Sequence, residues 1–349
     1  MHRTMMQGER KDERPDPGSE KRHLPDNRSF FGVIASLIQR KGTFRRSSIV
    51  LVNAIANLRT FPEIFKLLRK EPFFEALRTN PRLVVRCLTP DYLVRGFTVG
   101  VGARCFLHHH RRLQGTLPTD LVRQLMLGQV TLFETTDENA HISITIGQTR
   151  PLHDKEGELD IKLCVEGKTV FLLSFTVVPG AVAGSEAGEI MLISRMQGVA
   201  GCYSEIKLAR KVLADVAPNA LLLAAMQGIA MSLGIEVLAS VSSHQQNAYR
   251  EEVADRLHRN YEEFLGELGI EKNAAGFLVS VIPIPEKPMT SIKTGHKLRT
   301  KEKRATKLAV RDACHDFFRA RIVGEHTAKI RLIHDNPEVR QASATESPI

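Results

Sequence analysis

The stretch ELDIKLCVEGKTVFLLSFTVV, residues 158–178, decides the fold. Its first half carries apolar side chains at every second position from Leu159 to Val165. Such alternation is typical of a β-strand with one face against a core and the other in water. Residues 166–168 supply a tight turn, and the half that follows is apolar on both sides, which indicates a central strand. The stretch therefore predicts a β-hairpin inside a sheet.

The segments around this hairpin extend the sheet and then alternate with helices. Further strands are predicted at residues 129–136, 141–148, 190–196, 235–242 and 276–283. Helices are predicted at 204–216, 220–233, 249–268 and 306–322. The helix over 220–233 is apolar nearly all round, so it should be buried, and Gly234 should end it as a C′ glycine.

Before Gly128 the pattern is helical. Helices are predicted at residues 30–41, 47–58 and 62–70, and a short one opens at Pro118. Another should start at Thr89, an N-cap hydroxyl followed by proline, and run to the histidine cluster near His110.

The predicted fold class is α+β. A helical region, residues 29–128, packs on a mixed, mainly antiparallel sheet domain, residues 129–335, of about six or seven strands. Residues 1–28 and 336–349 are polar, and we expect them to be disordered tails.

Composition excludes several classes of protein. The chain has 349 residues, of which 42% are hydrophobic and 25% charged, as in ordinary globular proteins. Five cysteines without a CxxC pair indicate reduced thiols rather than a zinc site. No apolar run is long enough for a secretory signal or a spanning helix. We therefore expect a cytoplasmic protein, with peripheral contact at the inner membrane left open.

The net charge of +10 is concentrated in one segment. Lys287–Lys307 holds eight basic residues and one acidic residue, Glu302. We expect this segment to be an exposed loop that binds anionic membrane surfaces weakly. Nucleic acid is an unlikely partner, because the aromatic platform of single-strand binders is missing.

No motif for a nucleophile elbow, a metalloprotease or an EF-hand occurs, so the sequence does not decide whether the chain is an enzyme. Residues 108–110 are three histidines, which on a helix point in different directions and cannot share one metal. No metal site is predicted. His109 could be a packed side chain or a proton carrier.

Two further features stay open between a structural and a functional interpretation. Arg195, Gln197, Gly198 and Gly201 belong to a strand-to-helix turn that either is a plain glycine turn or cradles phosphate. Tyr261 lies on an apolar helical stripe, as a core tyrosine or as a proton donor beside a cleft.

Four stretches carry a resemblance to a known family. They are HHHRRL (108–113), LISRMQG (192–198), APNALLLAAMQGIAMSLGI (217–235) and YEEFLGELG (261–269). Together the chain over residues 80–322 resembles the VirK/YbjX family, a bacterial family of undetermined biochemistry. The resemblance implies a cytoplasmic accessory protein that acts through a protein partner in envelope or virulence functions.

The order of elements is also similar to that of GNAT acetyltransferases. This likeness implies coenzyme A or acetyl-coenzyme A as cofactor, with its pyrophosphate at the helix after Gly198. Arg195, Gln197 and Gly201 would then help to hold it, and Tyr261 would be the proton donor. An acyl-CoA-dependent acyltransferase is thus the alternative to the accessory protein.

Overall fold

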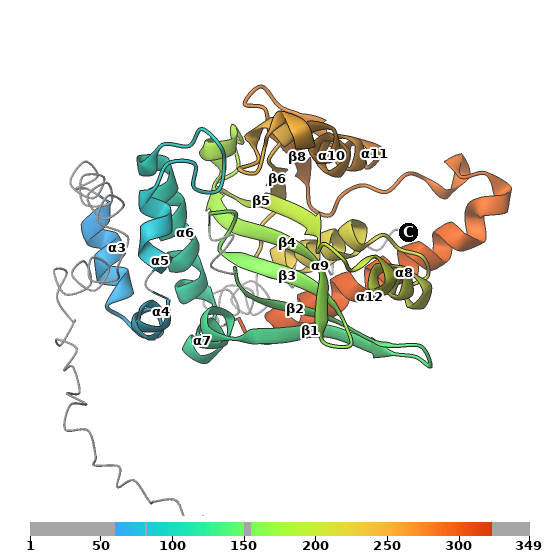
Figure 1. Cartoon of the computed structure of the whole chain (residues 1–349), viewed down its shortest axis with the longest axis horizontal. Coiled ribbons are helices and arrows are strands. Elements are labelled where there is room, and N and C mark those ends of the chain that lie inside the picture. Colours follow the sequence, from blue (N-terminus) through green and yellow to red (C-terminus); the bar gives the residue numbers. More distant parts are fainter. Residues whose placement is uncertain (1–59, 81, 150–154, 323–349) are drawn as a thin grey trace, which may run out of the picture.

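The structure is a computed structural model that describes residues 60–80, 82–149 and 155–322. Its centre is an eight-stranded sheet with the order β1-β2-β3-β4-β5-β6-β8-β7. The strands are β1 (Gln129–Thr136), β2 (His141–Gln148), β3 (Leu159–Val165), β4 (Lys168–Pro179), β5 (Glu189–Gly198), β6 (Val237–Ser240), β7 (Glu271–Lys272) and β8 (Leu278–Val281). Among these strands only β5 and β6 pair in parallel. The predicted α+β class is confirmed, with short β7 added to the predicted strands (Figure 1).

The hairpin of β3 and β4 forms where the sequence predicts it. Its two loop residues, Glu166 and Gly167, have φ of 49° and 72°. Positive φ at both positions is the geometry of a type I′ turn, which matches the twist of the flanking strands.

A helical front lies at one end of the strands, on the left in Figure 1. It consists of α3 (Phe61–Leu68), α4 (Phe73–Thr79), α5 (Arg82–Val85), the 3₁₀ turn Arg86–Leu88, α6 (Val99–Thr116) and α7 (Thr119–Leu127). The helices predicted at 62–70 and after Pro118 are confirmed. Those predicted at 30–41 and 47–58, and the polar tails, lie outside the described residues.

The predicted helix start at Thr89 is wrong. Thr98 caps α6 instead, since its Oγ1 accepts a hydrogen bond from the Val101 N–H. Asp91 and Leu93 have φ of 62° and 71°, and a helix cannot pass through left-handed residues. The Asp91 carboxylate accepts the Gly96 N–H at 2.7 Å, so this segment is a loop held by its own side chain.

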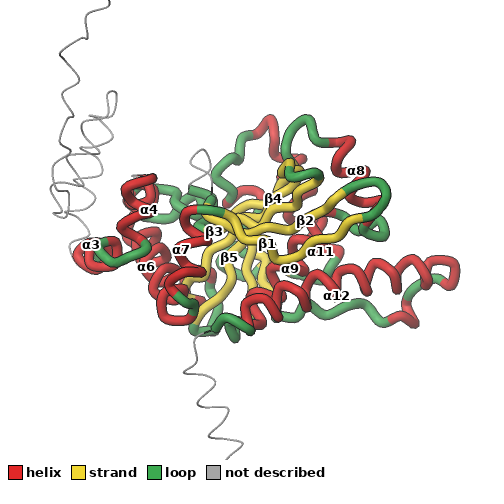
Figure 2. Tube along the Cα trace, turned by 90° about the horizontal axis from the view of Figure 1, so that it is seen from below, coloured by secondary structure: helices red, strands yellow, loops and turns green. Residues whose placement is uncertain are grey.

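The remaining helices cover the sheet and its far end. They are α8 (Tyr203–Val212), α9 (Pro218–Ser232), α10 (Ala254–His258), α11 (Phe264–Glu267) and α12 (Lys297–Arg319). The buried helix α9 packs on β3 and β4 and crosses α12, which Figure 2 shows along the lower side of the molecule. Gly234, with φ of 71°, ends α9 as predicted. A π-helical turn, Arg259–Glu263, interrupts the helix predicted over 249–268.

The prediction for the basic segment Lys287–Lys307 is wrong in part. Only its first half is irregular, because α12 begins at Lys297 and not near residue 306. Lysine and arginine are good helix formers, so a basic run is compatible with helix as well as with loop.

The two faces of the sheet differ in chemistry, but both are buried. One face carries the isoleucines of β2 and the leucines of β3 toward α9. The other face, which the alternation assigned to water, carries Asp160, Lys162, Ser174 and Arg195, each at most 3% exposed. We call it the polar face. The prediction of a solvated face is wrong, because burial depends on tertiary packing that alternation does not encode.

Candidate functional site

The strands β5 and β6 separate near the middle of β5. They pair only at Met191, Leu192 and Ile193, although β5 continues to Gly198. A β-bulge lies at this point, because Ser174 of β4 pairs with Arg195 while the next residue pairs with Ile193. We call the gap beyond Ile193 the β5/β6 fork. In α/β sheets ligands bind at the carboxyl ends of parallel strands where neighbours diverge, so the fork is a candidate ligand site.

Tyr261 forms the base of the fork. Its hydroxyl accepts a hydrogen bond from the Met196 N–H at 3.0 Å, a backbone group that lies beyond the paired part of β5. The side chain is 1% exposed, and burial is the main cause that raises the pKa of its phenol. The phenol therefore keeps its proton at neutral pH, and the residue packs in the core as well as facing the fork.

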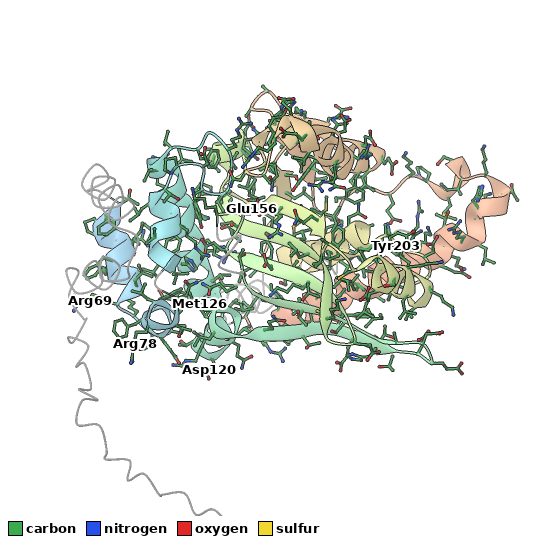
Figure 3. All side chains as sticks on the ribbon, viewed as in Figure 1. Arg69, Arg78, Asp120, Met126, Glu156 and Tyr203 are labelled. Carbon is green, nitrogen blue, oxygen red and sulfur yellow. The ribbon has the colours of Figure 1, made fainter. Side chains whose placement is uncertain are left out.

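A buried polar cluster lies next to the fork. Glu156 Oε2 lies 3.3 Å from Arg195 Nε, and Glu156 Oε1 accepts a hydrogen bond from Gln246 Nε2 at 2.9 Å. We call Glu156, Arg195 and Gln246 the fork cluster; Figure 3 labels Glu156 near β5. Arg195 Nη1 has no hydrogen-bond partner within the described residues, although Arg195 is buried. A buried donor without a partner is uncommon and indicates a position for a ligand atom or a water molecule.

The fork cluster continues onto the polar face. Asp160, Ser174 and Arg195 stand side by side on β3, β4 and β5. Asp160 Oδ1 accepts hydrogen bonds from Ser174 Oγ at 2.6 Å and from Thr149 Oγ1 at 3.0 Å. The row therefore carries a buried carboxylate on β3 and a buried guanidinium on β5, with Ser174 of β4 between them, and these groups can position a polar ligand.

The residues predicted to bind a cofactor fall into two places. Gln197 and Gly198 end β5 and Gly201 lies in the turn that follows, while the Arg195 side chain belongs to the fork cluster. The turn is exposed from Gly198 to Gly201, and Gly201 has φ of 76°. A Cβ on Gly198 would meet the Phe171 ring at 3.5 Å, an ordinary contact, so the backbone there is accessible.

The first turn of α8 already contains a carboxylate. Glu205 is bound by Lys168 and by Ser204 Oγ, and the hydrogen bond from Lys168 is the main cause that lowers the pKa of Glu205 to about 2. Any anion at this helix terminus would share Lys168 with Glu205.

The predicted histidines lie at the other end of the polar face, on α6. His110 Nε2 is 2.9 Å from Glu158 Oε2, and the same carboxylate oxygen binds Arg86. We call Arg86, His110 and Glu158 the front cluster; all three side chains are buried. Burial is the main cause that raises the pKa of Glu158, and the positive charge of Arg86 opposes this rise, so that the pKa is about 8. The cluster joins the helical front to Glu158, the residue before β3, and its contacts stabilise the fold.

His109 contacts the sheet separately. Its Nδ1 accepts a hydrogen bond from the Val177 N–H of β4 at 3.1 Å, and the residue is fully buried. Burial is the main cause that lowers the pKa of His109 to about 3. The imidazole therefore stays neutral, with its proton on Nε2. His108, in contrast, is partly exposed and faces Glu189, so the three histidines point apart as their spacing predicts.

This contact makes the stability of the fold dependent on pH. The folded pKa of His109 lies below the unfolded value of about 6.5, so its contribution is complete above 6.5 and is lost as the pH falls toward 3. We expect His109→Asn, whose Oδ1 can accept the Val177 N–H but cannot be protonated, to remove this loss. Between pH 7 and 5 the free energy of unfolding of the wild type should fall by about 2 kcal/mol more than that of the variant. Urea titrations at each pH measure the difference, and His296→Asn, an exposed control, should follow the wild type. Parallel curves for wild type and His109→Asn would contradict the assignment.

The sequence interpretation missed Glu156, Glu158, Asp160 and Lys162. The sequence contains a signal for three of them, since Glu158, Asp160 and Lys162 occupy alternate positions in the stretch that forms the centre of the sheet. It was interpreted as a solvated face, and only the tertiary structure shows that it is buried. Arg86 carried no signal of its own.

Other classes of site are not found in the described part of the chain. No group of three His, Cys, Asp or Glu side chains there could hold a metal ion. The five cysteines are buried and form no disulfide. None of the helices between residues 60 and 322 combines the length and the apolarity that crossing a membrane requires.

Comparison with known proteins gives one match. No curated protein and no solved structure matches the chain significantly. A family model described as "protein of unknown function (DUF535)" matches residues 40–305, which include the helical front, the polar face and the fork. This is the family of the VirK/YbjX proteins, to which the motifs around His108, Arg195 and Tyr261 also point. The chain therefore belongs to the DUF535 family.

Proposed function

We propose that the β5/β6 fork binds an acyl thioester of coenzyme A and that the chain transfers the acyl group to an acceptor on the polar face. The observation that carries this proposal is the separation of two parallel strands after Ile193, next to a β-bulge and a buried polar cluster. Beyond Ile193 no described strand pairs with β5 on this side, and the Met196 N–H already donates to Tyr261, so a ligand would contact β5 beside the Tyr261 hydroxyl. The resemblance of the predicted order of elements to that of GNAT acetyltransferases favours the same proposal.

The residues at the fork fit such a ligand. The exposed backbone of the turn at Gly198 and Gly201 leaves room for phosphate, which would share the positive charge of Lys168 with Glu205. When bound, the thioester supplies an activated acyl group. Transfer to an amine or hydroxyl then needs positioning and proton handling rather than a protein nucleophile.

The fork cluster is suited to that task. Arg195 Nη1, which has no partner in the described part of the chain, can donate a hydrogen bond to an oxygen of the molecule that receives the acyl group. Glu156 can accept the proton that this molecule loses, at Oε1 or Oε2. Tyr261, which holds its proton, is the donor for the leaving group. His109 takes no part in this scheme, because it lies on α6 and its Nδ1 is engaged by the Val177 N–H.

Coenzyme A should stabilise the protein against heat. At a concentration 100 times the dissociation constant, a ligand of the folded state adds about 2.7 kcal/mol. Gly198→Asp should abolish the shift in melting temperature, since it puts a carboxylate where phosphate is expected, while Tyr261→Phe should lower the melting temperature but keep the shift. Thermal melts with millimolar coenzyme A and acetyl-coenzyme A measure both effects.

A matched control lies at the other end of the same strand. Gly188 precedes β5, is exposed and has nothing within 4 Å of an added Cβ. Gly188→Asp should keep the full shift. If the wild type shows no shift, or if both aspartate variants lose it equally, the fork is not a coenzyme A site.

Membership of the family supports a second proposal, a VirK-type accessory protein that acts through a partner in envelope or virulence functions. Nothing in its chemistry requires the fork. Absence of a coenzyme A shift in the wild type would therefore leave this proposal in place and remove the acyltransferase.

A further inference from the structure

The start of α12 and the loop before it form a surface that the proposed acyl transfer does not use. Both extend beyond the sheet, on the right in Figure 1 and again in Figure 2. The eight basic residues of Lys287–Lys307 divide into two groups there. Arg299 and Lys303 bind Asp215, and Arg304 and Lys307 bind Glu286. Within the described residues, the ammonium groups of the other four, Lys287, Lys293, Lys297 and Lys301, have no ion-pair partner and are exposed.

Within α12, the two residues that bind Asp215 and the unpaired lysines point in different directions. Successive residues turn by about 100° around a helix axis, so Arg299 and Lys303 project away from Lys297 and Lys301. The side opposite Asp215 forms a continuous exposed arc of about 100°. It consists of Lys297, Leu298, Lys301, Ala305 and Leu308.

This arc mixes cations with apolar side chains that are open to solvent. Leu298 is 71% exposed and Leu308 is 46% exposed. Tyr203, on neighbouring α8, is 82% exposed at the same end of the molecule, where Figure 3 labels it. The ion pairs of Arg210 and Arg299 with Asp215 hold α8 and α12 together there. Exposed leucines flanked by lysines are typical of helices that lie in the plane of a membrane surface.

We infer that this arc, with Lys287 and Lys293 in the preceding loop, docks on an anionic lipid bilayer. The four unpaired lysines complement lipid phosphates and anionic headgroups, and Leu298 and Leu308 enter the boundary with the acyl chains. A duplex or single-stranded nucleic acid would use the lysines but not the leucines, and no aromatic side chain lies on the arc for a base to stack on. Glu302 is the one acidic residue within Lys287–Lys307, and Asp312, one turn beyond Leu308, is paired with Arg311.

Co-sedimentation of the full chain with lipid vesicles tests this inference. We expect binding to vesicles of phosphatidylcholine with 30% phosphatidylglycerol, weaker binding at high salt, and none to phosphatidylcholine alone. The double variant Lys297→Gln/Lys301→Gln should reduce partitioning about 25-fold, since each basic residue near an anionic surface contributes roughly a factor of five. Leu298→Ser should also reduce partitioning, and by a larger factor at high salt, where the insertion of Leu298 into the bilayer contributes a larger share of the affinity.

The matched control removes two lysines with the same spacing at the far end of the molecule. Lys66, in the last turn of α3, and Lys70, just beyond that helix, are exposed, and Lys66→Gln/Lys70→Gln should bind as the wild type does. Unchanged melting curves verify that each variant is folded. The inference is overturned if both double variants lose binding equally, or if neutral vesicles bind as well as anionic ones. It is also overturned if Leu298→Ser changes binding to no vesicle, or if a tRNA probe binds and vesicles do not.

Discussion

Replacing Glu158 with glutamine should lower the free energy of unfolding by about 3–5 kcal/mol, because it leaves the buried guanidinium of Arg86 without its counter-charge. Both side chains are fully buried, and Glu158 Oε2 also binds His110. The measurement is a urea unfolding curve at pH 9.5, well above the pKa of Glu158 of about 8, so that the wild-type carboxylate is charged.

The double variant Arg86→Met/Glu158→Gln separates charge from packing. It removes both charges and leaves an amide oxygen for His110, so it should be less destabilised than Glu158→Gln alone. Glu138→Gln, at an exposed turn, should change stability by less than about 0.5 kcal/mol. If the double variant is as unstable as the sum of the two single variants, the pair does not act as a unit.

Replacing Gly228 with alanine should cost about 3 kcal/mol by forcing two helices apart. A Cβ at this position of α9 would lie 2.0 Å from the carbonyl oxygen of Arg311 in α12. The obstacle is helix backbone, which cannot move as a flexible side chain can, so α12 must shift as a unit. Urea unfolding gives the loss, and proteolysis of a loosened α12 reports the displacement directly.

Gly115→Ala is the matched control for this substitution. Gly115 also lies inside a helix, α6, but nothing stands within 4 Å of its added Cβ. There alanine should stabilise by roughly 0.5–1 kcal/mol, the usual difference between the two residues in a helix. Equal effects at both positions would show that close approach of α9 and α12 is not the reason for Gly228.

Local sequence patterns predicted most of the sheet because strand signals are local. Alternation from Leu159 to Val165 and the turn at Glu166 and Gly167 specify the hairpin without help from the rest of the chain. The predictions of helix boundaries were wrong where a local sequence signal competed with contacts to distant residues. The sequence Thr89-Pro90 reads as a helix start, yet the loop places the cap at Thr98, and the basic run reads as loop although it enters α12.

The candidate site shows the same division. The sequence by itself determined the fold class, the hairpin, the buried character of α9 and the family, because these depend on side-chain type and spacing along the chain. Only the tertiary structure decided that Glu158, Asp160 and Lys162 face a covered side of the sheet, and that Arg86 and Arg195 meet carboxylates. Burial and ion pairing depend on contacts between distant residues, such as Arg86 and Glu158, which are 72 positions apart, and such contacts leave no periodic pattern in the sequence.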